Sequence, residues 1–402
     1  GAVRDWLRGV RPKDYDFTVG LDPQQLQSIL AASDFSLDLK GLKFGTIGVI
    51  LNGQSYEISS HRREAGYEDL RHPNSVAFDV TLEEDLARRD FTINAMAWSP
   101  ETGLIDPYGG QVDLERGLIR AVGDPQKRIT EDALRGLRAL RFAASLDFQL
   151  EAKTREAVLN SKQGLLTLPA ERVGEELWKL MSGVKALAIL QAYPWLWQSV
   201  LCLAEEPELF VGIPQDIEKL QLEDAISRLA YLFSLDFVAR DKRFWVSEVL
   251  DTLALIHHRD ELADYRALRP LIQEDFPLRS CERALEAWAF PAEIRLKILL
   301  SLVDICLGQR IEALDLKTAS ILWSAERYER VQNVSKSLGD ASFPWSKAEL
   351  MEMRESLPLD QADLAWDAKA LMAQGYRGPA IKQRRAEGLL DIWLSKEEES
   401  TP

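Results

Sequence analysis

The sequence predicts an α/β domain at its N-terminal end and an all-helical remainder. Residues 11–20 are rich in β-favouring side chains, and residues 43–60 form two β-rich arms around Asn52-Gly53, a preferred two-residue hairpin turn. Beyond about residue 185 the apolar residues recur with helical periodicity, and Leu, Ala, Trp and Glu are abundant. We therefore expect a mixed sheet at the start of the chain and helices after it.

Composition limits the classes of protein to consider. A chain of 402 residues is long enough for two or more domains, and its formal charge of −15 means that any nucleic-acid contact must come from local basic patches. The sequence shows neither a charged-then-apolar leader nor a run of membrane-spanning length. Cys202, Cys281 and Cys306 are far apart, which disfavours a structural zinc site and favours a reducing compartment. We expect a soluble, cytoplasmic protein.

Two carboxylates one residue apart, Asp14 and Asp16, form the first candidate site. Alternate side chains on a strand share a face, so a strand here would point both carboxylates the same way. A hard divalent cation such as Mg²⁺ takes oxygen ligands and would offset their repulsion. For an isolated Asp-x-Asp pattern, an acidic surface turn is the commoner explanation, so the surrounding sequence has to decide.

The predicted hairpin adds a third carboxylate. Counting outward from Asn52-Gly53 places Gly48 opposite Glu57. Because a glycine leaves room beside that carboxylate, Glu57 is a candidate to lie over the same site as the aspartates. A solvated strand glutamate is an equal alternative.

Two helix starts precede the hairpin. The opening Gly1 with Arg4 predicts a turn into a helix whose free backbone N–H groups can hold phosphate, although an ordinary helix start explains it equally well. Asp22, Pro23 and Gln25 predict a capping box and a first-turn proline for a helix through about Ala32.

Residues 61–79 are polar, mixed in charge and broken by glycine and proline, which predicts a mobile loop. Arg88, Arg89 and Asp90 follow beside an apolar helical run, and the Gly109-Gly110 pair after them is a candidate hinge. Paired arginines are usually a solvated face, but beside the carboxylates they become candidates for neutralising a triphosphate.

A helix is predicted over residues 128–148, with Thr130 as its N-cap. Asp132 and Arg135 lie three apart on one face, and Arg138 and Arg141 continue the spacing. An acceptor beside a donor matches the edge of cytosine or adenine, whereas uracil and guanine would set a carbonyl against the carboxylate. A salt-bridged helix surface is the commoner alternative.

Together these motifs resemble the class II tRNA nucleotidyltransferases, a family that includes CCA-adding enzymes and bacterial poly(A) polymerases. The matching stretches are GAVRD with DYDF, RRDFTINAMA, DPYGG, EDALRGLRALRFAA and PAERVGEELWKLM, and they occur in the family's order over roughly the first 185 residues. The family has a glycine pair preceded by a β-strand where this sequence opens on one glycine, so we expect the chain to be trimmed there.

The resemblance implies a nucleotidyltransferase head with a polymerase β-like mixed sheet, followed by all-α domains. We expect the head at residues 1–115, a helical neck with a nucleotide-selecting helix at 116–185, a helical body at 186–300 and a tRNA-binding helical tail at 301–402.

The resemblance also implies roles for the candidate residues. Asp14 and Asp16 would bind two catalytic Mg²⁺ ions, with Glu57 as a further catalytic carboxylate. The implied contacts to the substrates CTP and ATP come from Gly1, Arg4, Arg88, Arg89, Asp90, Asn94, Asp132, Arg135, Arg138 and Arg141. Of these, Asp132 and Arg135 would select the base in place of a nucleic-acid template.

A small basic cluster near the end of the chain is the candidate tRNA contact. Lys382, Arg384 and Arg385 follow Gly378-Pro379 and suit RNA phosphates, although a solvated helix end is a near-equal alternative.

The implied function is template-independent, metal-dependent addition of C and A to the tRNA 3′ end. Partial adders of A or CC, bacterial poly(A) polymerases and a non-catalytic RNA-binding protein stay open as alternatives. The presence of the 61–79 segment disfavours a CC-only enzyme, and no basic signature typical of the poly(A) polymerases follows the aspartate pair.

Overall fold

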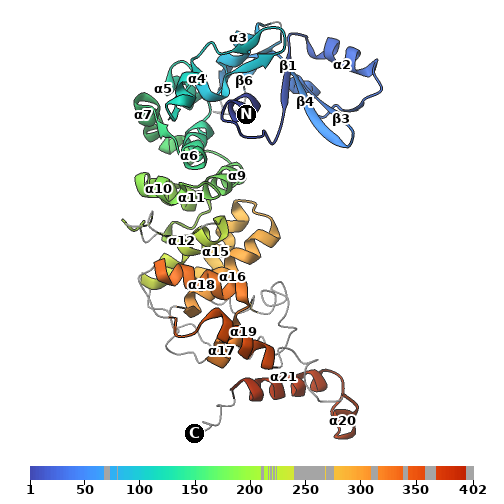
Figure 1. The fold of residues 1–402 in the computed structure, drawn as a ribbon, viewed down its shortest axis with the longest axis vertical. Helices are drawn as coiled ribbons and strands as arrows, with labels where there is room; N and C mark the ends of the chain where they lie inside the picture. The colour runs from blue at the N-terminus through green and yellow to red at the C-terminus, as the bar shows by residue number, and fades with distance from the viewer. Residues whose placement is uncertain are drawn as a thin grey trace. The chain divides into compact units, whose positions relative to one another are not determined.

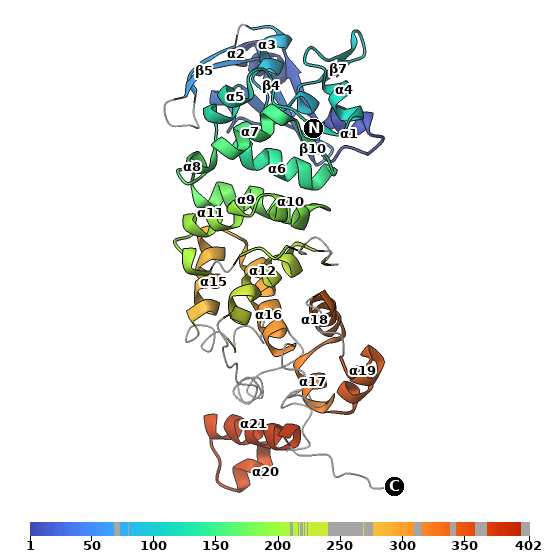
Figure 2. The ribbon, with the colours of Figure 1, turned by 90° about the vertical axis from the view of Figure 1, so that its left-hand side faces the viewer.

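A computed structural model describes most of the chain. The described residues are 1–67, 73–78, 80–209, 212–215, 217, 220, 222, 224–239, 268, 276–308, 316–337, 343–357 and 368–394. They form two compact units, an N-terminal unit of Gly1–Pro169 with Gly183–Lys185 and a C-terminal unit of Ala170–Ser182 with Ala186–Pro402. Figures 1 and 2 label the helices and strands of each. The division into four domains stays a prediction.

The N-terminal unit is organised around a four-stranded mixed sheet. Its strands are β1 (Asp16–Val19), β2 (Ser36–Asp38), β3 (Thr46–Leu51) and β4 (Gln54–Ser60), in the order β1-β4-β3-β2. β1 runs parallel to β4, and the other neighbours are antiparallel. The predicted hairpin register is confirmed, with Gly48 paired to Glu57. Asn52 and Gly53 have φ angles of 52° and 77°, as the tight turn requires.

One face of this sheet is covered by α2 (Pro23–Ala31), which Figure 1 shows beside the strands. Leu26 and Leu30 of the helix pack with Ile47 and Val49 of β3 to form a buried cluster. Burying such side chains contributes about 1.5–3 kcal/mol each. This packing fixes which face of the sheet is apolar and leaves the other to polar residues.

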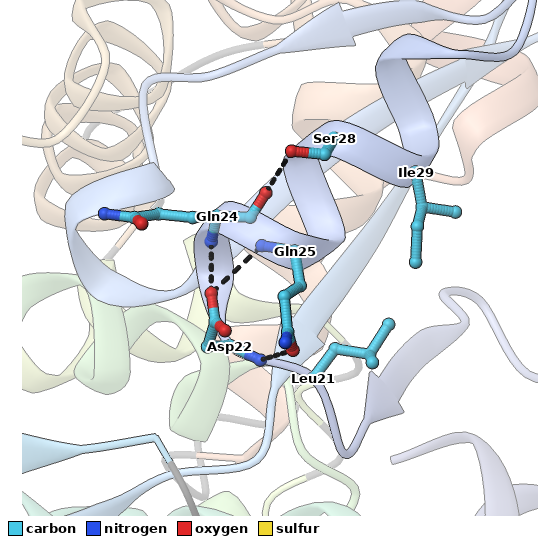
Figure 3. A pocket seen from close by; sticks show the side chains of 6 residues that line it. All are labelled: Leu21, Asp22, Gln24, Gln25, Ser28 and Ile29. Carbon is cyan, nitrogen blue, oxygen red and sulfur yellow. Dashed lines mark hydrogen bonds between the residues drawn. The ribbon is translucent and has the colours of Figure 1, made fainter.

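The start of α2 confirms the predicted capping box (Figure 3). The Asp22 carboxylate accepts the N–H groups of Gln24 at 2.8 Å and Gln25 at 3.0 Å. The Gln25 side chain in turn accepts the Asp22 N–H at 3.3 Å. These contacts satisfy backbone donors that the first helical turn leaves without partners. The shallow pocket drawn in Figure 3 surrounds this capped end.

The prediction of a loop over residues 61–79 was wrong for the part that the structure describes. β5 (Arg63–Tyr67) and β6 (Pro73–Ala77) pair as an antiparallel ribbon. Proline is tolerated at the first position of β6 because a strand end can lack one N–H donor, and the glycine in β5 does not prevent main-chain pairing. Residues 68–72 and 79 lie outside the described residues.

Short elements complete the N-terminal unit. They are α1 (Ala2–Leu7), η1 (Leu42–Phe44), α3 (Leu82–Ala87), η2 (Thr92–Asn94), β7 (Ala97–Ser99), β8 (Gly103–Ile105), α4 (Gly110–Glu115), β9 (Leu118–Ile119), β10 (Gln149–Leu150), α7 (Ala152–Asn160) and α8 (Lys162–Leu165). β7 pairs with β8, and β9 pairs with β10.

Residues 128–148, predicted to form a single helix, instead contain the end of one helix and the whole of the next. α5 (Pro125–Glu131) is capped by Asp124 and continues through Thr130, which is therefore not an N-cap. Asp132 is extended (φ −147°, ψ 105°), and its carboxylate accepts the N–H of the first residue of α6 (Leu134–Leu146) at 3.0 Å. The expectation failed because the Asp-Pro pair starts a helix earlier and Asp132 then interrupts it.

The elements described in the C-terminal unit are all helices, which confirms the predicted fold class. They are α9 (Ala170–Met181), α10 (Ala186–Ala192), α11 (Trp195–Leu203), η3 (Pro207–Leu209), α12 (Ala225–Ala239), α15 (Phe276–Ala287), α16 (Ala292–Gly308), α17 (Leu316–Leu322), α18 (Ala325–Ser337), α19 (Lys347–Ser356), α20 (Ala368–Ala373) and α21 (Pro379–Leu394).

Aromatic side chains form one core of the C-terminal unit. The Trp197 ring centroid lies 5.3 Å from that of Phe233 and 5.9 Å from that of Trp288. The Trp288 indole N–H donates to the Val200 carbonyl at 3.2 Å, so the buried ring keeps a polar partner. A Cβ added to Gly174 would lie 2.3 Å from the Trp288 carbonyl oxygen, so the close packing against the Trp288 backbone requires glycine.

Within the described residues, no single helix is both long and apolar enough to cross a membrane. α10 and α11 meet the length and composition only when they are taken together, and a bend of 96° separates them.

Candidate active site

The uncovered face of the four-stranded sheet carries a row of acidic residues. Asp16 of β1 pairs with Glu57 of β4, Glu57 pairs with Gly48 of β3, and Gly48 pairs with Asp38 of β2. Because directly paired residues point to the same side of a sheet, these carboxylates share one face. α2 covers the opposite face, so the acidic row points away from the core.

Gly48 divides this row into two parts. A Cβ at position 48 would lie 3.1 Å from the Asp38 Cβ, so a side chain there would crowd its neighbour. The backbone N–H of Lys40 donates to Asp38 at 3.1 Å, and this bond is the main reason that the pKa of Asp38 is lowered. In contrast, no other described side chain is hydrogen-bonded or ion-paired to Asp16 or Glu57. Their oxygens are therefore available to a ligand.

Asp14 does not share the strand with Asp16. β1 begins at Asp16, so the expectation of a strand over residues 11–20 that aligns both carboxylates was wrong in extent. The physical reason is that the ladder to β4 starts at the Asp16–Glu57 pair, and the preceding segment has no strand partner among the described residues. Asp14 is exposed two residues before the sheet edge.

The donor chemistry of this face fits a hard divalent cation. Asp16 and Glu57 supply carboxylate oxygens from neighbouring strands, which lie about 4.8 Å apart in a sheet, and Mg²⁺ prefers such ligands. Across the described part of the chain, no three Asp, Glu, His or Cys side chains cluster in a metal-binding arrangement. A bound cation would thus complete its shell with water and substrate oxygens, as Mg²⁺ commonly does.

A second group of site residues is joined by hydrogen bonds. Arg4 of α1 donates to the Asn94 side chain at 2.7 Å, and Asn94 donates to Asp90 at 3.0 Å. Asp90 also accepts two bonds from Arg138 of α6, at 2.9 and 2.7 Å. Four residues that the sequence assigns to one nucleotide site are therefore linked in one continuous network.

Phe142 lies at the centre of the same group. The guanidinium carbons of Arg4, Arg138 and Arg141 lie 5.2, 5.6 and 3.8 Å from its ring centroid. Cations are attracted to the negative face of an aromatic ring at these distances. Phe142 was missed by the sequence analysis because an aromatic residue on an apolar helix face gives the same signal as any core residue.

Asp90 is charged in this network. Burial alone would raise the pKa of its carboxyl, but the Arg138 charge and the hydrogen bonds from Asn94, Arg138 and the Phe91 N–H outweigh it and lower the pKa. An ionised carboxylate under Arg138 therefore holds that guanidinium in place.

Arg88 and Arg89 follow α3 and interact with Asp85, a buried residue of that helix. Arg88 donates to one Asp85 oxygen at 3.0 and 2.8 Å, whereas Arg89 lies 3.6 Å from the other oxygen. The sequence analysis missed Asp85 because its spacing predicts only an ordinary helical ion pair.

Gly1 precedes α1 and is exposed, and its carbonyl oxygen accepts the backbone N–H of Asp5 at 3.1 Å. Its contact with the nucleotide stays a prediction.

The predicted base-selecting residues have different partners. Asp132 accepts a backbone N–H of α6, while Arg135 donates to Glu131 at 2.8 Å and to the Arg128 carbonyl at 2.9 Å. Glu131 also pairs with Arg128 at 3.0 Å. The sequence analysis missed Glu131 as the partner of Arg135, although the four-residue spacing between them was the signal that could have revealed this ion pair.

Known proteins resemble this chain in sequence and in fold. Residues 1–120 match the family model of the poly A polymerase head domain, and residues 147–193 match a probable RNA and SrmB-binding site of polymerase A. The CCA-adding enzyme of Lactobacillus helveticus is 40% identical over 217 residues, which cover 54% of this chain and 53% of the relative. That of Anoxybacillus flavithermus is 34% identical over 71% of this chain and 66% of the relative.

The solved structure of the Bacillus stearothermophilus CCA-adding enzyme in complex with CTP is 30% identical and has a TM-score of 0.63. The similarity covers 98% of this chain and 86% of that one. The chain belongs to the CCA-adding enzyme family. It spans about half the length of the first curated CCA-adding enzymes that it matches, from 45% to 53%.

Membership of the CCA-adding enzyme family confirms the predicted head sheet with helical domains after it. The individual residue roles stay predictions, including those of the tail. Lys382, Arg384 and Arg385 all lie on α21, where Lys382 is exposed and Arg384 pairs with Glu387 at 3.1 Å. A glutamate within the cluster reduces its net positive charge, which weakens the signal for a phosphate contact.

Proposed function

We propose that this protein adds C and A residues from CTP and ATP to the 3′ end of tRNA without a nucleic-acid template. The observation that carries the proposal is the pairing of Asp16 with Glu57 on the uncovered face of the sheet, in the same unit as the hydrogen-bonded network of Arg4, Asn94, Asp90 and Arg138. A nucleotidyl transfer needs carboxylates for cations and basic groups for phosphates at one place. The N-terminal unit of this family member offers both.

In the proposed reaction the tRNA 3′-hydroxyl attacks the α-phosphate of the nucleotide, and pyrophosphate leaves. Asp14, Asp16 and Glu57 would hold two Mg²⁺ ions. Such ions, when bound, lower the pKa of the hydroxyl and offset the charge of the leaving pyrophosphate. Arg89 and the Arg138 network would bind the phosphates and the ribose, which orients the α-phosphate towards the hydroxyl.

Base choice would come from Asp132 and Arg135. The carboxylate accepts from the exocyclic amine of cytosine or adenine, and the guanidinium donates to the neighbouring ring atom. Uracil and guanine would place a carbonyl oxygen against Asp132 and be rejected. Arg135 already points its charge at Glu131, so the base would compete with, or share, that contact.

The remaining assignments follow from this proposal. The basic residues of α21 would contact tRNA phosphates, and the enzyme would work in the cytoplasm. The three widely spaced cysteines are compatible with that reducing compartment.

The test is an extension assay with Mg²⁺ and labelled CTP or ATP. Three tRNAs are offered, ending at the discriminator base, at C and at CC, and the product ends are sequenced. We expect CCA on the first, CA on the second and A on the third.

Other outcomes would change the assignment. Extension of only one of the three tRNAs would identify a partial adder, and a long A tract would indicate a poly(A) polymerase. No extension together with retained tRNA binding would indicate a non-catalytic RNA-binding protein. As the matched variant, Asp14→Ala should abolish extension while tRNA binding in a gel-shift assay stays unchanged, and normal turnover by that variant would remove Asp14 from the metal site.

A further inference from the structure

Asp85 is a buried carboxylate beside the candidate site, and only 1% of its surface is exposed. It lies on α3, directly before the two arginines that the sequence assigns to the triphosphate. One of its oxygens, Oδ1, accepts the backbone N–H of Arg62 at 3.1 Å and hydrogen bonds from Nε and Nη2 of Arg88. Asp85 thus joins the base of the β5–β6 ribbon to the end of α3.

The two arginines are held differently. Arg88 forms charge-assisted hydrogen bonds of 3.0 and 2.8 Å to Asp85, and its side chain is 18% exposed. Arg89 is 32% exposed and lies 3.6 Å from the Asp85 Oδ2, beyond hydrogen-bonding distance. Among the described residues this is the one ion pair of Arg89. Arg88 is therefore fixed, whereas Arg89 is held by charge alone.

The Oδ2 atom of Asp85 has no hydrogen-bond partner in the described part of the chain, although it is buried. The Nε atom of Arg89 is also buried and has no hydrogen-bond partner there. A buried pair that served stability alone would gain from satisfying both groups, because an unsatisfied buried polar atom costs about 1–3 kcal/mol. The Arg89 guanidinium and Asp85 Oδ2 thus lie close together, at 3.6 Å from Nη2, without a hydrogen bond between them.

Arg89, which Asp85 holds without a hydrogen bond, lies where it could contact a ligand. Arg89 directly precedes Asp90, whose carboxylate accepts hydrogen bonds from Asn94 and Arg138 of the candidate site. An anion bound beside this network would offer Arg89 the full hydrogen bonds that Asp85 does not provide.

We propose that Asp85 is a positioning residue that divides the arginine pair into a fixed brace and a movable phosphate ligand. Asp85 holds Arg88 rigidly against α3. It also keeps Arg89 near the site until the β- and γ-phosphates of a nucleoside triphosphate bind the Arg89 guanidinium. The inference rests on the proposed function and deepens it, because it assigns phosphate contact to Arg89 and a structural role to Arg88.

The experiment compares binding of CTP and CMP by isothermal titration calorimetry in the presence of Mg²⁺. CMP lacks the two phosphates that Arg89 would contact. We expect Asp85→Asn and Arg89→Gln each to weaken CTP binding about tenfold, because each removes or misplaces a charge-assisted hydrogen bond, and to leave CMP binding within about twofold. Arg88→Gln should lower the thermal unfolding midpoint and leave the ratio of the CTP and CMP affinities unchanged.

Asp304→Asn is the matched control. Asp304 is also 1% exposed and also carries two arginine bonds, at 2.8 and 2.7 Å from Arg327, but it belongs to the C-terminal unit. Its loss should lower stability and leave both nucleotide affinities unchanged. A merely structural role of Asp85 would give the same pattern as this control.

The outcomes separate the inference from the proposed function. If the unmodified protein binds CTP and Arg89→Gln affects CTP and CMP equally, or neither, the positioning role is refuted while the proposed function stands. The same holds if Arg88→Gln and Arg89→Gln behave alike. If the unmodified protein fails to bind CTP and ATP, the proposed function itself is refuted. Arg89 is partly exposed, so its variant tests the inference even if Asp85→Asn does not fold.

Discussion

Replacing Asp90 by asparagine removes the charge that holds Arg138 over the candidate site. Asp90 is 9% exposed and accepts bonds of 2.9 and 2.7 Å from Arg138 and one of 3.0 Å from Asn94. Breaking a fully buried ion pair costs roughly 3–5 kcal/mol. Because the Arg138 side chain is 33% exposed and can be hydrated, and because asparagine keeps one acceptor oxygen, we expect about 2 kcal/mol here.

Native-state hydrogen exchange measures this loss where it occurs. A decrease of about 2 kcal/mol in the free energy of opening corresponds to an exchange rate about 30-fold faster for the protected amides of α6. Amides of α2, which packs on the other face of the sheet, provide the internal control and should be unchanged. Arg138→Gln combined with Asp90→Asn should cost little more than either change alone, because both remove the same interaction.

The pH dependence gives a second test of the same pair. The pKa of Asp90 is lower in the folded protein than in the unfolded chain, so its contribution to stability is complete above the unfolded pKa and is lost as the pH falls through the folded pKa. The difference between the unmodified protein and Asp90→Asn should therefore be constant from pH 7 to about 5 and shrink below about 4. Equal exchange of α6 in both proteins, or a difference that grows on acidification, would refute the reasoning.

Other features of the N-terminal unit give three further expectations. Asp132→Ala should reduce the preference for CTP over UTP in the extension assay, and unchanged selectivity would remove Asp132 from base recognition. Gly110→Ala should lower the free energy of unfolding by at least about 1–3 kcal/mol in thermal unfolding, because its Cβ would lie 2.2 Å from the Thr92 carbonyl oxygen. The Cβ in Gly109→Ala meets no atom within 4 Å, so this change should cost only the strain of the positive φ. In urea unfolding, Leu26→Ala should lower the free energy of unfolding by about 2–5 kcal/mol, and the change at the exposed Ile29 to alanine by less than about 0.5 kcal/mol. Similar losses for the two variants would contradict the packing of Leu26 between α2 and the sheet.

Local patterns of the sequence predicted local structure well. The Asn52-Gly53 turn fixed the register that brings Gly48 opposite Glu57, and the Asp22 capping box fixed the start of α2. In each case residues within about ten positions of one another decide the geometry. The placement of Glu57 beside Asp16, in contrast, required a parallel pairing between segments about forty residues apart, which the sequence supports only through chemistry and resemblance.

Most of the errors have a common physical origin. The break at Asp132 follows from the earlier helix start at Asp124-Pro125, whereas the extent of β1 and the ribbon of β5 and β6 depend on which partner a segment finds in the folded chain. Asp85 and Phe142 were missed for the same reason, since their importance comes from the arginines gathered around them. Propensity cannot identify such residues because helical ion pairs and buried aromatics are common everywhere.

The extended backbone of Asp132 has a consequence for how selectivity evolves. A carboxylate in the middle of a helix would be aimed by that helix alone, but this one occupies the joint between α5 and α6. Its direction depends on the angle between the two helices. Under the proposed role of Asp132 in base selection, substitutions in the core beneath either helix, remote from any nucleotide, can therefore retune which base is accepted while Asp132 and Arg135 stay the same.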